Sequence, residues 1–225
     1  MILQQQTSPL RGERGVMSRT YETLRIAVDM DEVLTDTLGK QLRLYNQRYG
    51  TNASRSDLHG NNLVDIAPAE HKEWLVSMLH EPGFFADLEP LPGALEGMER
   101  LCEQHDVFIA SAATQFPNSF NEKIAWLKLY LPQIPLNRII FCGDKSILNV
   151  DYLIDDSAYH FEGLRGTGLL FDAPHNQHKR GYFRVHGWAE VDVAIALHEA
   201  RKSRGDYTAH EEGYESEDLL KLNFK

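Results

Sequence analysis

The chain has 225 residues, of which 42% are hydrophobic, so it can bury a full core as one domain or as a domain with a small inserted lid. Its net charge of -10, from 33 acidic against 23 basic residues, argues against broad binding of a nucleic-acid polymer, which needs basic surface. No segment approaches the roughly 18 apolar residues of a membrane span, and the 2 cysteines indicate neither a zinc site nor a disulfide framework. We therefore expect a cytoplasmic protein with reduced thiols and no membrane partner.

The N-terminal half predicts one strand followed by a helical segment. Residues 1–23 lack periodicity and predict a disordered leader, and residues 26–28 form an apolar run long enough for a buried strand. Apolar residues at helical spacing predict a helix from Leu38 to Tyr49 and another that begins at Pro68, with a polar loop over 51–65 between them. Because residues 37–90 contain no convincing strand, we expect them to form a helical cap over an active site, and we call them the cap segment.

The rest of the chain alternates short apolar strands with amphipathic helices. Strands are predicted at 107–110, 139–141, 152–154 and 169–171, helices around Met98 and Leu127, and a last helix over 191–201. This alternation predicts an α/β fold: a parallel sheet with helices on both faces, built from residues 24–36 and 91–202. Residues 203–225 are expected to be an acidic C-terminal tail.

An acidic pair follows the first predicted strand. Asp29 and Asp31 lie one residue apart at the carboxyl end of residues 26–28, where both can face one small site. Two carboxylates that close repel each other unless a cation neutralises them, which favours a hard metal ion such as Mg²⁺. The alternative is that they are solvated turn residues or helix N-caps.

Polar residues of the types that phosphoryl transfer requires follow three later strands. Ser111 could hold phosphate oxygens or cap a turn, and Lys145 could stabilise a phosphoryl group or simply be solvated. Asp155 and Asp156 form a second acidic pair after the strand at 152–154. An acidic pair, a hydroxyl, a lysine and an acidic pair, each after a predicted parallel strand, together indicate one crevice.

In this order of motifs the sequence resembles the haloacid dehalogenase-like phosphatases, and within them the 5'(3')-deoxyribonucleotidases of the cytosolic and mitochondrial type. The resemblance covers about residues 25 to 178 and includes these segments: Asp-Met-Asp-x-Val-Leu at 29–34, Phe-Phe-x-Asp-Leu-Glu-Pro-Leu-Pro-Gly-Ala at 84–94, Glu-Lys-x-Ala-Trp at 122–126, Asp-Lys at 144–145 and Leu-Ile-Asp-Asp at 153–156. It implies a Rossmann-like core, dependence on Mg²⁺ and an aspartyl-phosphate intermediate.

The resemblance also assigns roles to individual residues. Asp29 would be the nucleophile and a metal ligand, and Asp31 the acid/base, with its backbone carbonyl on the metal. Asp156 would complete the protein ligands, with Asp155 beside it as a supporting or alternate ligand. Ser111 and Lys145 would bind the phosphate.

The chain departs from the family pattern at the positions that surround the substrate. Glu32 stands where many members have glycine, Ser111-Ala112 replaces a Thr-Ser pair, and residues 51–65 lack the aromatic cluster of the eukaryotic enzymes. Phe85 remains as the base-facing aromatic, unless it only packs the cap segment against the core.

The favoured interpretation is a Mg²⁺-dependent 5'(3')-deoxyribonucleotidase whose small-molecule partner is a phosphomonoester: it would hydrolyse deoxyribonucleoside monophosphates to nucleoside and phosphate. A phosphatase for another small phosphorylated metabolite, and a non-catalytic binding protein on the same fold, remain open, as does the choice between monomer and homodimer. His175 and His178 fall in a segment that reads as loop, which argues against a metal site there. Trp74, Trp126 and Trp188 are expected to pack in the core or the cap segment.

Overall fold

The computed structural model describes residues 23–205. The predicted leader, apart from Thr23, and residues 206–225 of the predicted acidic tail lie outside these residues, so the predictions made for them stay predictions.

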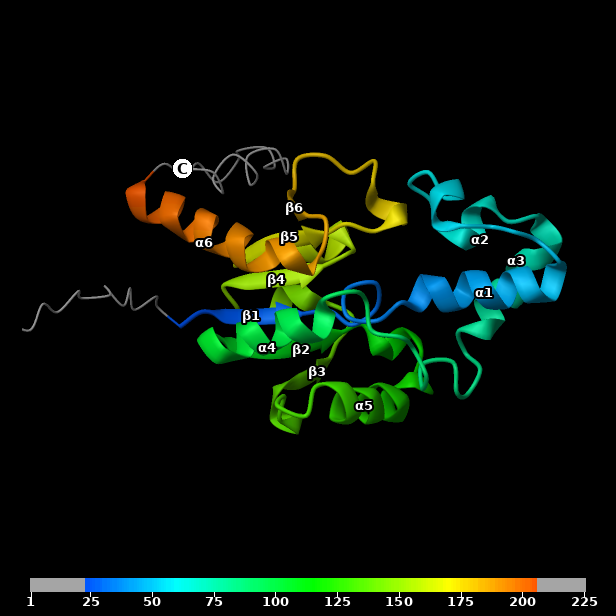
Figure 1. Ribbon diagram of the computed structural model, residues 1–225, viewed down its shortest axis with the longest axis horizontal. Helices are drawn as coiled ribbons and strands as arrows, with labels where there is room; N and C mark the ends of the chain where they lie inside the picture. The colour runs from blue at the N-terminus through cyan, green and yellow to red at the C-terminus, as the bar shows by residue number, and fades with distance from the viewer. Residues whose placement is uncertain (1–22, 206–225) are drawn as a thin grey trace, which may run out of the picture.

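Six parallel strands form a single sheet in the order β3-β2-β1-β4-β5-β6 (Figure 1). The strands are β1 (Arg25–Val28), β2 (Asp106–Ser111), β3 (Ile139–Phe141), β4 (Tyr152–Asp155), β5 (Thr167–Phe171) and β6 (Phe183–Val185). The predicted parallel α/β fold is confirmed. The edge strand β6 was not predicted, because Phe183-Arg184-Val185 is only three residues long and carries an arginine at its centre.

The two faces of the sheet are covered differently. Ile26 and Val28 of β1 point into the larger core cluster, where α4 (Ala94–Gln104) and α6 (Trp188–Arg204) pack. Ala27, between them, faces the other side with Leu153 of β4. That side is closed by the connections that contain η4 (Lys145–Ile147) and η5 (Ala158–Phe161), two short 3₁₀ helices. The remaining core elements are α5 (Ser119–Tyr130), η2 (Ala113–Gln115), η3 (Leu136–Arg138) and η6 (Pro174–Asn176).

The order of the strands places a crevice at the carboxyl end of β1. From β1 the chain runs outward through β2 to β3, then returns to the other side of β1 and continues through β4 to β6. The connections at the carboxyl ends of β1 and β4 therefore diverge, which is where ligands bind in open parallel sheets. The predicted acidic pairs lie at these two strand ends.

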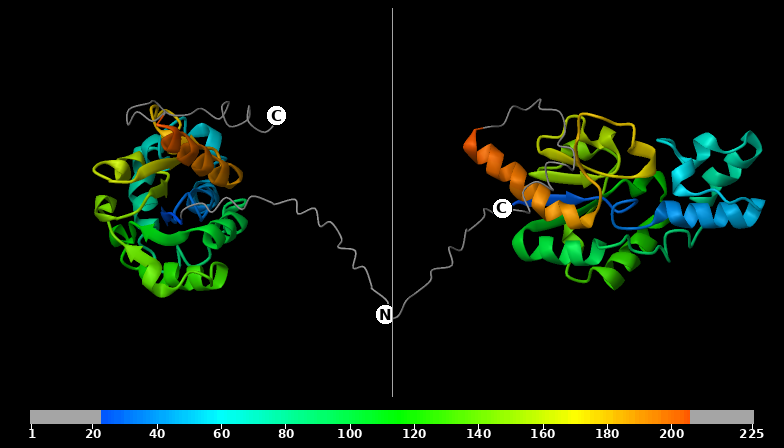
Figure 2. Two further views of the ribbon diagram at one scale, coloured as in Figure 1. Left: turned by 90° about the vertical axis from the view of Figure 1, so that its left-hand side faces the viewer. Right: turned by 45° about the horizontal axis from the view of Figure 1, so that its top comes forward.

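The helices of residues 37–78 extend beyond the carboxyl ends of the strands (Figures 1 and 2). They are α1 (Thr37–Tyr49), η1 (Arg55–Asp57), α2 (Leu63–Ile66) and α3 (Ala69–Met78). Asp36 caps the start of α1 by accepting from the backbone N–H of Gly39, and Gly50 ends the helix in the left-handed conformation. The prediction of a loop over 51–65 was wrong, because η1 and the first turn of α2 fall inside it. Asp57 and Asp65 stabilise these turns by accepting from the backbone N–H groups of Ser54 and Asn62.

The two ends of this insertion run side by side at its base. Thr35 and Pro90 form an isolated antiparallel bridge, and the backbone N–H of Asp36 donates to the carbonyl of Glu89 at 2.8 Å. The indole N–H of Trp126 donates to the carbonyl of Leu88 at 2.8 Å, which fastens the returning chain to α5. The insertion is thus anchored to the core at both ends. Within residues 23–205, no helix is long and apolar enough to cross a membrane.

Candidate active site

The loop after β1 carries Asp29 and Asp31 and is held by backbone and side-chain bonds. The N–H of Asp29 continues the sheet by donating to the carbonyl of Ile154 at 2.9 Å. The hydroxyl of Thr35 donates to the carbonyl of Met30 at 3.1 Å, and the indole of Trp188 donates to the carbonyl of Val33 at 2.7 Å. The two aspartates are therefore presented by a short loop that is tied to β4 and α6.

Asp29 and Lys145 form the buried centre of the site. Asp29 is 5% exposed and Lys145 is 1% exposed. The ammonium of Lys145 donates to Asp29 Oδ1 at 2.7 Å and to Asp155 Oδ2 at 2.5 Å. Burial raises the pKa of Asp29 to about 6 although Lys145 opposes the shift. Burial alone would lower the pKa of Lys145, but Asp29 and Asp155 outweigh it and raise the pKa, so the lysine stays charged.

The second acidic pair contains two carboxylates in different surroundings. Burial favours the neutral form of Asp155, yet Lys145 and His160 lower its pKa. His160 Nδ1 lies 2.9 Å from Asp155 Oδ2, and the backbone N–H of Ser157 donates to Asp155 Oδ1 at 2.9 Å. Asp155 is thus fully engaged by protein groups.

Asp156 has no comparable partner. Burial raises its pKa well above the ordinary value, and the neighbouring carboxylates of Asp155 and Asp29 add to the shift. Within residues 23–205 no lysine or arginine forms an ion pair with Asp156; His175 Nε2 lies 3.3 Å from its Oδ2, and burial lowers the pKa of that histidine. The backbone carbonyl of Asp156 accepts from the amide of Asn176 at 2.7 Å.

The charges of this cluster fit a divalent cation. Asp29, Asp155 and Asp156 each offer a carboxylate oxygen, and these atoms lie within 4.8 Å of one another. One lysine faces the three carboxylates, which leaves an excess of negative charge in a buried site. Carboxylate oxygens at such spacing are the donor set of a hard cation such as Mg²⁺.

Asp31 lies on the open side of the loop and is held by two groups from other elements. Thr37 at the start of α1 donates to Asp31 Oδ1 at 3.1 Å, and Lys123 of α5 forms an ion pair with Oδ2. Lys123 is fully buried and also donates to the hydroxyl of Ser111 at 3.0 Å. Its ammonium lies 4.8 Å from the centre of the Phe85 ring. One buried cation therefore connects Asp31, Ser111 and Phe85.

Phe85 is packed more tightly than a free stacking platform would be. It is 2% exposed, and its ring lies 4.9 Å from that of Phe84 and 5.7 Å from that of Phe116. Glu122, beside Lys123 on α5, accepts from the backbone N–H groups of Gly83 and Phe85 at 2.6 and 2.9 Å. Phe85 still borders the cavity, but Phe116, which is partly exposed, offers more of its ring.

Glu32 occupies the position where many family members have glycine, and its backbone explains that preference. Its φ of 56° lies in the left-handed region, which costs a non-glycine residue about 1 kcal/mol. Its carboxylate is buried and accepts from the backbone N–H of Leu38 at 2.6 Å and from Arg55 Nη1 at 2.9 Å. Arg55 also pairs with Asp36. These bonds hold the strained residue and link the loop after β1 to η1 of the insertion.

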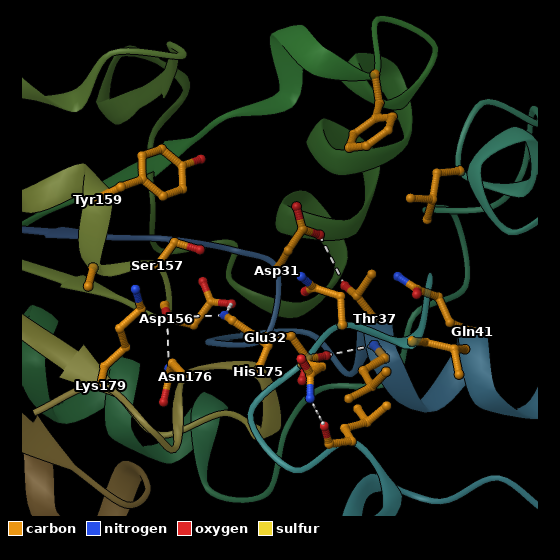
Figure 3. A pocket seen from close by; sticks show the side chains of 18 of the residues that line it. Asp31, Glu32, Thr37, Gln41, Asp156, Ser157, Tyr159, His175, Asn176 and Lys179 are labelled. Carbon is orange, nitrogen blue, oxygen red and sulfur yellow. Dashed lines mark hydrogen bonds and ion pairs between the residues drawn. The ribbon is translucent and has the colours of Figure 1, made fainter. Parts of the chain in front are cut away.

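A cavity of about 460 Å³ opens above these groups (Figure 3). Asp31, Asp156 and His175 border it on the core side, and Thr37 and Gln41 of α1 border it on the side of the insertion. Tyr159 stands at the rim, across the cavity from Gln41 (Figure 3). The cavity therefore joins the acidic crevice to the insertion helices.

Of the predicted site residues, Asp31, Phe85 and Asp156 border this cavity. The others, Asp29, Ser111, Lys145 and Asp155, are not among the residues that line it but are linked to these by contacts. Lys145 joins Asp29 to Asp155, and the carboxylate of Asp156 lies beside them. Lys123 joins Asp31 to Ser111 and contacts the ring of Phe85. The sequence analysis quoted Lys123 in the segment Glu-Lys-x-Ala-Trp but gave it no role. His160 was not assigned to the site, because its contact with Asp155 carries no local sequence signal. His175 was set aside because its segment was expected to be loop, whereas the structure places it in η6 beside Asp156.

The parallel sheet and the acidic crevice between β1 and β4 define a haloacid dehalogenase-like hydrolase, the class that the sequence predicts. A family model described as 5' nucleotidase, deoxy (pyrimidine), cytosolic type C protein matches residues 22–202. The chain belongs to this family.

Relatives and solved structures are similar to the chain over most of its length. A Staphylococcus epidermidis protein named "Putative 5'(3')-deoxyribonucleotidase" is 41% identical over 167 residues, which cover 74% of this chain and 93% of that relative. The 5'(3')-deoxyribonucleotidase of Bacillus subtilis is 30% identical over 74% of this chain and 95% of its own. A haloacid dehalogenase-like hydrolase from Streptococcus pneumoniae matches with a TM-score of 0.47 and 13% identity, over 77% of this chain and 98% of its own.

Proposed function

We propose that this chain is a Mg²⁺-dependent 5'(3')-deoxyribonucleotidase, which hydrolyses deoxyribonucleoside monophosphates to nucleoside and phosphate. Membership of the family supports the proposal, and the arrangement around Asp29 is the observation that carries it. A buried carboxylate, one oxygen of which is held by Lys145, lies beside Asp155 and Asp156, and Asp156 borders the open cavity. This is what nucleophilic attack on a phosphomonoester requires.

In the first step Asp29 attacks the phosphorus atom. Because Oδ1 accepts from Lys145, Oδ2 is the oxygen left to form the bond to phosphorus. The phosphorus–ester oxygen bond breaks, and Asp31 donates a proton to the departing sugar oxygen, so that an aspartyl phosphate and a free nucleoside result. In the second step Asp31 takes a proton from water, which attacks the phosphorus and releases phosphate from Asp29.

The carboxylates of Asp29 and Asp156 and the backbone carbonyl of Asp31 would hold Mg²⁺. Asp155 stays beside these ligands, since Lys145, His160 and the N–H of Ser157 already engage its oxygens. When bound, the cation would offset the negative charge between Asp29 and the phosphoryl oxygens.

Ser111 and Lys145 are proposed to hold the phosphoryl oxygens. Lys145 supplies a charge that burial between two carboxylates keeps fixed. The hydroxyl of Ser111 accepts from Lys123 and so keeps its own O–H free to donate.

The cap segment, residues 37–90, is proposed to close over the part of the substrate beyond the phosphate, with Phe85 bordering that space. Its helices α1 and α2 and the loop between them line the cavity opposite the acidic crevice, which supports this role. The cysteines Cys102 and Cys142 are both free, which fits the cytoplasmic location that we propose.

A phosphate-release assay with Mg²⁺ over deoxynucleoside monophosphates, ribonucleoside monophosphates and sugar phosphates tests the proposal. We expect the highest kcat/KM on deoxynucleoside monophosphates and no phosphate release in excess chelator. Equal kcat/KM on sugar phosphates would instead favour a phosphatase for another small metabolite, and full activity in chelator would contradict the metal dependence.

A further inference from the structure

Gln41 borders the cavity with an amide group that is free to bind a ligand. It lies on α1 four residues after Thr37, so the two side chains share one face of the helix. Thr37 donates to Asp31, and Gln41 stands one helical turn farther from the acidic crevice, about 6 Å along the axis. In the described part of the chain, the Gln41 amide has no hydrogen-bond partner.

The other side-chain amides that border the cavity form hydrogen bonds with neighbouring groups of the protein. Asn61 donates to the carbonyl of Leu58 at 2.9 Å, and Asn62 donates to Asp65 at 3.0 Å, so both serve the turns that contain them. Asn176 donates to the carbonyls of Asp156 and Phe171 and accepts from Arg184. Gln41 alone among these four amides keeps both its donor and its acceptor for a ligand.

The surroundings of Gln41 suit a flat, mostly apolar ring with a polar edge. Six leucine and phenylalanine side chains border the same cavity: Leu38, Leu58, Leu63, Leu79, Phe85 and Phe116. A buried or half-buried amide surrounded by such residues is costly to leave without a partner. A nucleobase supplies faces for the apolar wall and an edge with a donor and an acceptor for the amide.

We propose that Gln41 is the specificity-determining residue that reads the edge of a pyrimidine base in this cavity. This inference rests on the proposed function and assigns the base contact within it. The glutamine amide can rotate to present its oxygen to the amino group of cytosine or its NH₂ to the exocyclic oxygen of thymine, with the remaining group on the adjacent ring nitrogen. One side chain thus accepts both pyrimidines.

The test compares substrates with and without a base. We would measure kcat/KM on dTMP, dCMP and 2-deoxyribose 5-phosphate for the wild type, Gln41→Leu, Gln41→Glu and the control Gln47→Leu. Gln47 is an exposed residue of the same helix and does not border the cavity. All the introduced residues are good helix formers, and a thermal melt of each variant verifies folding.

We expect the Gln41 variants to differ from the wild type in the ratios of kcat/KM between substrates. Gln41→Leu should lower the ratio of kcat/KM between dTMP and deoxyribose 5-phosphate about 10- to 100-fold, the range for loss of a two-point base contact, whereas Gln47→Leu should leave the ratio at its wild-type value. Gln41→Glu should lower the ratios of kcat/KM for both dTMP and dCMP to that for deoxyribose 5-phosphate, because a carboxylate has no donor for the thymine oxygen or for the cytosine ring nitrogen.

Three outcomes would overturn the inference: a Gln41→Leu ratio equal to that of the wild type, a Gln41→Glu variant whose dTMP and dCMP ratios to deoxyribose 5-phosphate equal those of the wild type, or a wild type that hydrolyses dTMP no faster than deoxyribose 5-phosphate. If the wild type hydrolyses dTMP no faster than deoxyribose 5-phosphate, the protein is a phosphatase that does not recognise the base. If the wild type releases phosphate from none of the three substrates, the proposed function itself is contradicted. Failure of the inference and failure of the function are therefore distinct.

Discussion

Replacing Lys123 with methionine tests whether a residue without assigned chemistry sets the geometry of Asp31. The ammonium makes two charge-assisted bonds, to Asp31 and to Ser111, each worth about 1.5–3 kcal/mol when made. The Asp31 side chain is 32% exposed and can be rehydrated, and removing a fully buried charge returns part of its desolvation cost. We therefore expect the free energy of unfolding to fall by only about 1–2 kcal/mol.

The kinetic effect of Lys123→Met should exceed its effect on stability. Without the lysine, Asp31 keeps only the bond from Thr37 at 3.1 Å and can turn away from the leaving oxygen. We expect kcat on dTMP to fall about 10- to 100-fold, less than the roughly 10²–10⁴-fold loss for removing a general acid/base altogether.

Single-turnover kinetics and a matched control variant separate an effect on Asp31 from a general effect of the substitution. The step that forms the phosphoenzyme should slow more on dTMP than on p-nitrophenyl phosphate, whose leaving group needs no proton. Lys128→Met, at an exposed position of the same helix, should change neither rate. A folded Lys123→Met enzyme with kcat within twofold of Lys128→Met, or with equal slowing on both substrates, would refute the role of Lys123 in positioning Asp31.

Four further predictions follow from the proposed mechanism. Asp29→Asn should abolish turnover while circular dichroism stays native, because an amide cannot carry the phosphoryl group; more than a few per cent of residual activity would make the nucleophile assignment wrong. Asp31→Asn should lower kcat about 10²–10⁴-fold in the phosphate-release assay, and a loss below tenfold would argue for another acid/base. EDTA should stop phosphate release and Mg²⁺ restore it while Ca²⁺ does not, since Ca²⁺ has a looser coordination; recovery with Ca²⁺ would contradict the compact site. Phe85→Ala should lower the free energy of unfolding by about 3–5 kcal/mol in urea titration, with similar losses of kcat/KM on dTMP and p-nitrophenyl phosphate, because the ring is 2% exposed; a loss confined to dTMP would show base stacking instead.

The strand ends were predictable because each is marked by local chemistry. The apolar run at 26–28 stops at Asp29, and the run at 152–154 stops at Asp155 and Asp156. Parallel strands present their carboxyl ends at one edge, so residues after β1 and β4 had to meet once the sheet formed. Hydrophobic patterning thus places both acidic pairs at one edge of the sheet, and the pairing of β1 with β4 brings them together.

The residues that contact these aspartates from other elements, and the edge strand β6, were not predictable in the same way. Lys123 lies on the helix α5. A lysine on a helix is ordinarily solvated, and the packing of α5 under the loop after β1 buries this one. His160 reaches Asp155 through a 3₁₀ turn that periodicity does not reveal. The short edge strand β6 gives too few residues for an alternating pattern.

The loop after β1 shows why the distant supports matter for function. Its residue Glu32 has a left-handed backbone conformation, which is unfavourable for most residues other than glycine. The strain persists because the Glu32 carboxylate accepts hydrogen bonds from the backbone N–H of Leu38 and from Arg55. Those partners belong to α1 and η1, so the insertion that borders the cavity is attached to the residue next to Asp31. A movement of η1 relative to the sheet would therefore be transmitted to the loop that carries Asp31 through one buried carboxylate.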